Sequence, residues 1–78
     1  MNASPIDEPR FSYEIYTEKL LPPMDHLTHI AKVSRMIDRK QKMDINVNTF
    51  GEMWGTGDAD ARQKMIKKVE KWISLQSQ

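Results

Sequence analysis

The chain is 78 residues long, with 38% hydrophobic and 29% charged residues, no cysteine, and a formal net charge of +1 at pH 7. Without cysteine there are no disulfides, no thiolate catalysis and no cysteine-ligated metal site, and the apolar content argues against intrinsic disorder. The sequence contains neither 18 consecutive apolar residues nor the apolar run of a signal peptide, so we expect no membrane interaction and a cytoplasmic protein.

The first ten residues contain two prolines and no periodic pattern. We therefore expect 1–10 to be a flexible N-terminal tail. Residues 11–76 have room for a single domain, and a core this small is marginally stable. Self-association into a homo-oligomer could add stability to such a small core, so a homo-oligomer is one of the expected alternatives.

Residues 11–21 fit two structures. Phe11, Tyr13 and Ile15 alternate as in a strand, whereas Phe11, Ile15 and the two leucines that end the segment also suit one face of a helix. We favour a helix, which the following proline pair ends.

Residues 25–42 have the pattern of an amphipathic helix, with Asp25 as its N-cap. Its apolar face holds residues spaced by three and four: Leu27, Ile30, Val33, Ser34 and Ile37. Its opposite face is expected to be a cationic stripe made of Lys32, Arg35, Arg39 and Lys42.

Residues 43–48 alternate apolar and polar side chains, which is typical of an extended segment. The next segment, 49–54, begins with a capping-box pattern, Thr49 followed three residues later by Glu52, and predicts a short helical turn.

Residues 59–75 have the clearest helical pattern, with Asp58 as the cap. One face is apolar: Met65, Ile66, Val69, Trp72 and Ile73. A second cationic stripe lies on another face: Lys64, Lys67, Lys68 and Lys71.

Together these patterns predict a mainly α fold: a small three-helix domain with helices at 11–21, 25–42 and 59–75 and a short helical turn at 49–54. The alternative is an α+β fold in which 11–16 and 43–48 pair as a two-stranded sheet.

No catalytic, cofactor or metal site is expected. His26 and His29 lie one helical turn apart, but two ligands do not make a metal site and nothing supplies a third. The carboxylate pairs lie in polar stretches, and the three glycines are too few and wrongly spaced for a phosphate loop. An enzyme is therefore disfavoured.

The function expected is that of a non-enzymatic protein-binding module, a small regulator, adaptor or inhibitor that occupies a partner protein's surface. Phe50, Met53 and Trp54 are the candidate apolar anchors, because aromatic residues and Met are enriched at interfaces. Cations would steer the module toward an acidic partner: Arg35, Arg39, Lys67 and Lys71.

The alternative function is nucleic-acid binding, by a dimer that lays both cationic stripes along phosphates. This hypothesis requires the two stripes to lie on one face of the fold. Its candidate residues are Lys32, Arg35, Arg39, Lys42, Lys64, Lys67, Lys68 and Lys71.

Overall fold

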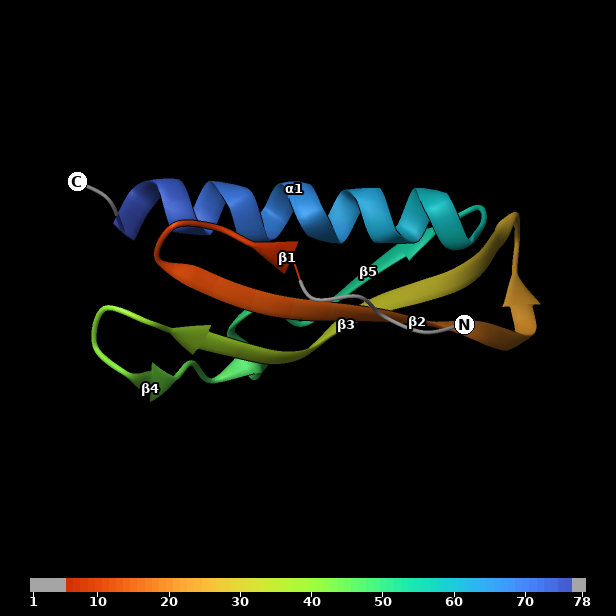
Figure 1. Cartoon of the computed structure of the whole chain (residues 1–78). Helices are drawn as coiled ribbons and strands as arrows, with labels where there is room; N and C mark the ends of the chain where they lie inside the picture. Colours follow the sequence, from red (N-terminus) through yellow and green to blue (C-terminus); the bar gives the residue numbers. More distant parts are fainter. Residues whose placement is uncertain (1–5, 77–78) are drawn as a thin grey trace.

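The computed structural model describes residues 6–76, which form two layers: a five-stranded antiparallel sheet and one long helix that covers one face of it (Figure 1). The elements in chain order are β1 (Ile6–Asp7), β2 (Phe11–Met24), β3 (Leu27–Asp38), β4 (Met43–Asp44), the 3-10 helix η1 (Val47–Thr49), β5 (Glu52–Gly55) and α1 (Asp58–Gln76).

The centre of the sheet is the hairpin of β2 and β3. The pairing begins with Phe11 and Asp38, at what we call the proximal end of the hairpin. It ends with Met24 and Leu27 beside the hairpin turn, which we call the distal end. The short β1 pairs with the beginning of β2, so it lies at one edge. Both β4 and β5 pair with β3, β4 near its C-terminal end and β5 along residues 29–32.

Strand β2 buries one face and exposes the other. Phe11, Tyr13 and Ile15 are buried, and the residues between them are partly exposed. This is the alternation expected of a strand, because successive side chains point to opposite faces of a sheet. The buried face of β2 packs under α1.

Strand β3 contains a β-bulge. Glu14 pairs with Arg35 and Ile15 pairs with Val33, so Ser34 has no residue opposite it on β2. The extra residue shifts the alternation by one position, and Val33 and Met36 therefore both reach the core although they are three residues apart.

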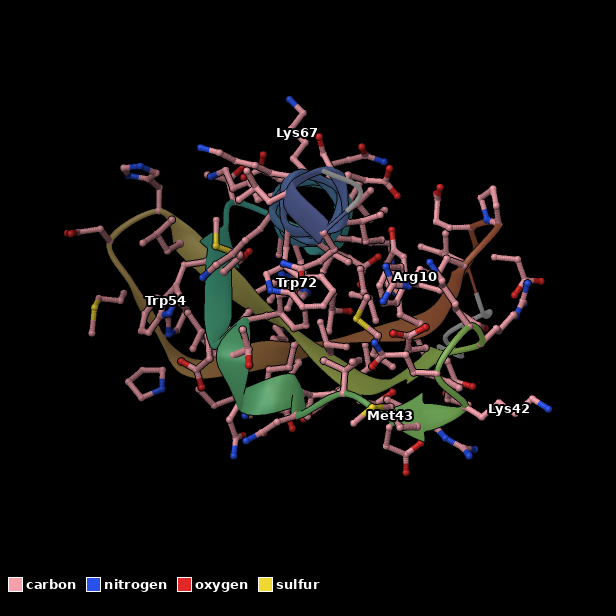
Figure 2. All side chains as sticks on the ribbon, turned by 90° about the vertical axis from the view of Figure 1, so that its left-hand side faces the viewer. Arg10, Lys42, Met43, Trp54, Lys67 and Trp72 are labelled. Atoms are coloured by element: carbon pink, nitrogen blue, oxygen red, sulfur yellow. The ribbon has the colours of Figure 1, made fainter. Side chains whose placement is uncertain are left out.

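Helix α1 covers the hairpin with one apolar stripe. Ala61, Met65 and Val69 are spaced by four residues, lie on the same side of the helix and are fully buried. Trp72 extends this stripe toward the C-terminal end and lies between helix and sheet (Figure 2). Its ring meets the rings of Phe11 and Phe50 edge-on, with centroids 5.4 Å away in each pair, so it joins β2, the η1–β5 segment and α1.

The end of β3 is held by Asp38, a buried acidic residue. Its carboxylate accepts hydrogen bonds from Arg10 Nε at 3.1 Å and Arg10 Nη2 at 2.8 Å, and from the amides of Lys40 and Gln41 at 3.0 and 3.2 Å. These donors, Arg10 first, lower the pKa of Asp38 below its ordinary value. The ion pair connects the turn before β2 to the turn after β3.

The mainly α, three-helix prediction is wrong, because two of its three helices are strands. The segments 11–21 and 25–42 form most of the β2–β3 hairpin, and Asp25 is a turn residue with φ of 56° instead of a helix cap. The second error arises because the apolar residues of 25–42 lie on both faces of the sheet. Ile30 pairs with Trp54 and Ile37 with Ser12 on the face away from α1, whereas Val33 pairs with Ile15 on the face under α1, so their three- and four-residue spacing imitates that of a helix.

The other elements are correct in part. The helix expected at 59–75 is present as α1, but its apolar face packs on the sheet and not on other helices. The alternative α+β fold has the wrong pairing, because residues 11–16 pair with β3 and not with 43–48. The turn expected at 49–54 is divided between η1 and β5, and Asn46, not Thr49, caps η1 by accepting a hydrogen bond from the Asn48 amide.

Of the segment 1–10 that we expect to be a flexible tail, residues 1–5 lie outside the described residues. Ile6–Asp7 forms β1 and pairs with β2, and Ile6 packs against the core.

Gly55 lies where β5 passes close to the first turn of α1. A Cβ there would lie 2.4 Å from the Ala61 amide nitrogen and 2.7 Å from the Ala61 Cα. We expect Gly55→Ala to lower the free energy of unfolding in urea by at least about 2 kcal/mol, because backbone atoms cannot move aside cheaply. The control is Gly57→Ala, whose Cβ meets no atom within 4 Å and should change this free energy by less than about 1 kcal/mol. Equal losses would contradict the tight packing of β5 on α1.

The lowered pKa of Asp38 makes its contribution to stability depend on pH. That contribution is complete above the ordinary value of 3.8 and is lost as the pH falls through the lower pKa of the folded state. We expect Asp38→Asn to lower the melting temperature at pH 7 and to have a smaller effect at pH 2.5, as followed by circular dichroism. A loss of the same size at both pH values would show that the charge of Asp38 does not stabilise the fold.

Candidate functional site

The distal end of the hairpin carries an apolar tip, residues 21–24, with the sequence Leu-Pro-Pro-Met. Leu21 is 81% exposed and Met24 is 57% exposed, and the two prolines between them are also exposed. The pairing of β2 with β3 is interrupted between Lys19 and Met24, so the tip bulges from the regular ladder. Four consecutive apolar residues therefore face solvent.

The tip is exposed because the hairpin is longer than the helix that covers it. Strand β2 has 14 residues in a molecule whose longest extent is 41 Å, whereas the 19 residues of α1 span about 28 Å. In Figure 1 the hairpin turn lies beyond the N-terminal end of α1, at the right of the view. Helix α1 therefore cannot cover the tip.

The tip is also restrained. Proline fixes φ near −65°, and Pro22 and Pro23 lie between the paired residues Lys19 and Met24. Little conformational entropy remains to be lost there when the tip contacts another molecule.

The face of the sheet opposite α1 is mostly charged around β5. Tyr16, Lys32 and Glu52 lie side by side on β2, β3 and β5. Lys32 Nζ forms ion pairs with Glu18 Oε1 at 3.3 Å and Glu52 Oε2 at 3.5 Å, and Glu18 is the main reason that its pKa is raised. A hollow of about 670 Å³ opens beside these residues and is lined by Tyr16, Lys32, Val33, Ser34, Val47, Asn48, Gly51 and Glu52. Its lysine is neutralised by two carboxylates, so it is not a cationic site.

A second groove, which we call the cationic groove, lies near the proximal end of the sheet. It has a volume of about 500 Å³ and is lined by Arg35, Ile37, Arg39, Lys42, Met43 and Asp44. It lies at the other end of the hairpin from the apolar tip.

The three residues expected to be apolar anchors are separated by the fold. Phe50 is only 1% exposed and belongs to the core. Met53 is partly buried against that core, and Trp54, the next residue of β5, points to the other face of the sheet. Only Trp54 is available on the outer surface.

The two cationic segments also end up apart. Lys67 points away from the sheet on the outer side of α1, whereas Lys42 lies at the opposite end of the view, beyond the sheet (Figure 2). Lys64 and Lys68 donate hydrogen bonds to the carbonyls of Trp54 and Phe50, at 3.2 and 2.6 Å, and so attach α1 to the β5 region. The structure therefore does not bring the two stripes to one face.

Sequence reasoning missed the apolar tip. The sequence contains the run Leu-Leu-Pro-Pro-Met, but the helix predicted at 11–21 uses this run only as its end. A turn following two prolines, flanked by two long apolar-rich segments, is a hairpin signal that could have indicated it.

The structure brings together one carboxylate pair that was also missed. The Tyr13 hydroxyl donates a hydrogen bond to Glu70 Oε2 at 2.8 Å, and burial and this bond raise the pKa of Tyr13. Glu8 lies against the same carboxylate, and Glu70 raises the pKa of Glu8 by favouring its protonated, hydrogen-bonding form. The cluster joins β2, α1 and the turn after β1, and a structural role accounts for it.

His26 and His29 do not converge on a metal site. His29 Nδ1 lies 2.8 Å from Thr28 Oγ1, and among residues 6–76 no three His, Cys, Asp or Glu side chains could hold an ion together. Within the same residues, no helix is both long enough and apolar enough to cross a membrane.

No protein-family model, no curated protein and no solved structure matches this chain.

The raised pKa of Glu8 makes the cluster less favourable as the pH rises. The protonated form of Glu8 is favoured in the folded state, so its contribution to stability is present at low pH and is lost above the raised pKa. We expect Glu8→Gln, which keeps a donor toward Glu70 and removes the repulsion, to raise the melting temperature at pH 7.5 and to leave it unchanged at pH 3.5. The opposite pH trend would contradict the proximity of these two carboxyl groups.

Proposed function

We propose that this protein is a non-enzymatic protein-binding module that inserts its apolar tip into an apolar pocket of a partner protein. The observation that carries the proposal is the exposure of four consecutive apolar residues, 21–24, at the end of a restrained hairpin. Leu and Met are normally buried in a folded protein, and a contiguous exposed patch of them marks an interaction site.

Burial of the tip would contribute to the free energy of binding. Burying a Leu or Met side chain contributes about 1.5–3 kcal/mol, so Leu21 and Met24 together supply several kcal/mol before the prolines are counted. Because the tip is already restrained, little of this is lost in ordering it. Binding alone is enough for a regulator, adaptor or inhibitor, which blocks a surface or stabilises one state of its target.

Nucleic-acid binding through both cationic stripes receives less support. That hypothesis needs the stripes on one face, and α1 and the sheet separate Lys67 from Lys42. Lys32, Lys64 and Lys68 are also engaged by carboxylates or backbone carbonyls.

The test is to place a photo-reactive amino acid at position 21, or at position 75 as a control, and to identify the proteins captured by each in native extract. Leu75 is the matched control because it is also an exposed leucine, 60% exposed, on α1. We expect one protein captured from position 21 only.

The purified partner then allows affinities to be compared by calorimetry. Leu21→Ser with Met24→Ser should weaken binding by at least about 30-fold, which is about 2 kcal/mol, and Leu75→Ser by no more than about twofold. Circular dichroism checks that each variant is folded. Equal weakening by the control would refute the proposal, as would position 21 reacting only with a second copy of the chain or with lipid vesicles.

A further inference from the structure

The cationic groove has an excess of positive charge that the rest of the described chain does not neutralise. Its lining holds three cations, Arg35, Arg39 and Lys42, against one acidic residue, Asp44. Arg39 is engaged, since its Nη2 lies 2.5 Å from Asp7 Oδ1 and its Nη1 donates to the carbonyl of Glu8 at 3.2 Å.

Arg35 and Lys42 are the two cations of the groove without an acidic partner. No ion pair joins either of them to an acidic side chain within residues 6–76, although Glu14 lies opposite Arg35 in the β2–β3 register. Other cations of the described residues also lack an ion pair, but none of them lines this groove: Lys19, Lys40, Lys67, Lys68 and Lys71. The groove therefore combines two unpaired cations with a concave surface.

The groove also contains an apolar surface. Met43 is 50% exposed and Ile37 is partly buried beside it, so a ligand that carries both negative charge and an apolar group would contact both kinds of side chain. Guanidinium groups bind carboxylates through paired hydrogen bonds, and burying a Met adds apolar contact.

We propose that the cationic groove binds an acidic peptide segment of a partner protein, in which carboxylates flank an apolar side chain. The lining favours a peptide over a nucleic acid because it contains no aromatic ring on which a base could stack. The aromatic residues of the outer sheet face lie outside this lining: Tyr16 on β2 pairs with Lys32, and Trp54 on β5 pairs with Ile30.

This site is separate from the apolar tip and does not depend on it. Leu27 begins β3 at the distal end and Ile37 lies ten residues further along, which is a distance of about 33 Å in a strand. A molecule with two binding sites at opposite ends of one hairpin can join two partners, or two parts of one partner.

The experiment follows the backbone amide signals of the isotope-labelled full chain by NMR. The probe is a blocked five-residue peptide, Glu-Glu-Leu-Glu-Glu, and its matched control is Gln-Gln-Leu-Gln-Gln. We expect saturable shifts at residues 35–44 with the acidic peptide and none with the neutral one. Shifts spread over the whole surface, or absent, would overturn the proposal.

Charge-matched variants then separate the groove from general electrostatic attraction. Arg35→Gln with Lys42→Gln should weaken binding of the acidic peptide by at least about tenfold, and Lys67→Gln with Lys71→Gln, on the outer side of α1, by no more than about twofold. Equal weakening by the two pairs would overturn the proposal.

Two further probes identify the class of ligand. Tighter binding of an oligothymidylate than of the peptide would assign the groove to nucleic acid, and equal binding of inorganic phosphate would assign it to a small anion. Either result overturns the peptide proposal. Neither bears on the apolar tip, whose shifts at residues 20–27 are monitored in the same spectra.

Discussion

One helix has to cover a hairpin that is longer than itself, and this mismatch shapes the rest of the molecule. The stripe of Ala61, Met65 and Val69 buries the inner face of β2 and β3, and Trp72 closes the core at its C-terminal end. The core is made almost entirely by this contact, so the distal end of the hairpin and the outer sheet face remain uncovered. The exposure of the tip is a geometric consequence of the fold, and its apolar sequence is the reason that we propose it as a binding surface.

Within residues 6–76, six of the twelve cations form ion pairs or hydrogen bonds that hold the fold together, so the cations do not form a continuous basic surface. Arg10 pairs with the buried Asp38 and joins two turns at the proximal end of the sheet. Lys64 and Lys68 reach backbone carbonyls of the β5 region, and Lys32 bridges two strands through glutamates. The net charge of +1 therefore conceals an uneven arrangement, in which unpaired positive charge is found together with an open groove near β4.

The sequence was sufficient to predict an element whose pattern is local. The helical period of α1 and the position of Trp72 on its apolar face follow from the spacing of the apolar residues alone. A helix forms its backbone hydrogen bonds within itself and needs only one apolar stripe to pack. The sequence was insufficient for β3, since the bulge at Ser34 changes the side on which the following residues lie. The helix predicted at 11–21 is wrong for a different reason: without a partner strand, the alternation of Phe11, Tyr13 and Ile15 competes with an equally plausible helical spacing.

For the candidate sites too, the sequence determines one part and the tertiary structure determines the other. Residue types alone exclude cysteine chemistry, and the protein-binding module with apolar and cationic contacts that they suggest stays a prediction. Which residues are available was decided only by the tertiary structure, which buried Phe50, turned Trp54 to the opposite face from Met53, and left Leu21 and Met24 uncovered. The physical reason is that exposure depends on strand pairing between residues far apart in the chain and on how far one helix reaches, and neither quantity is written in any local stretch of sequence.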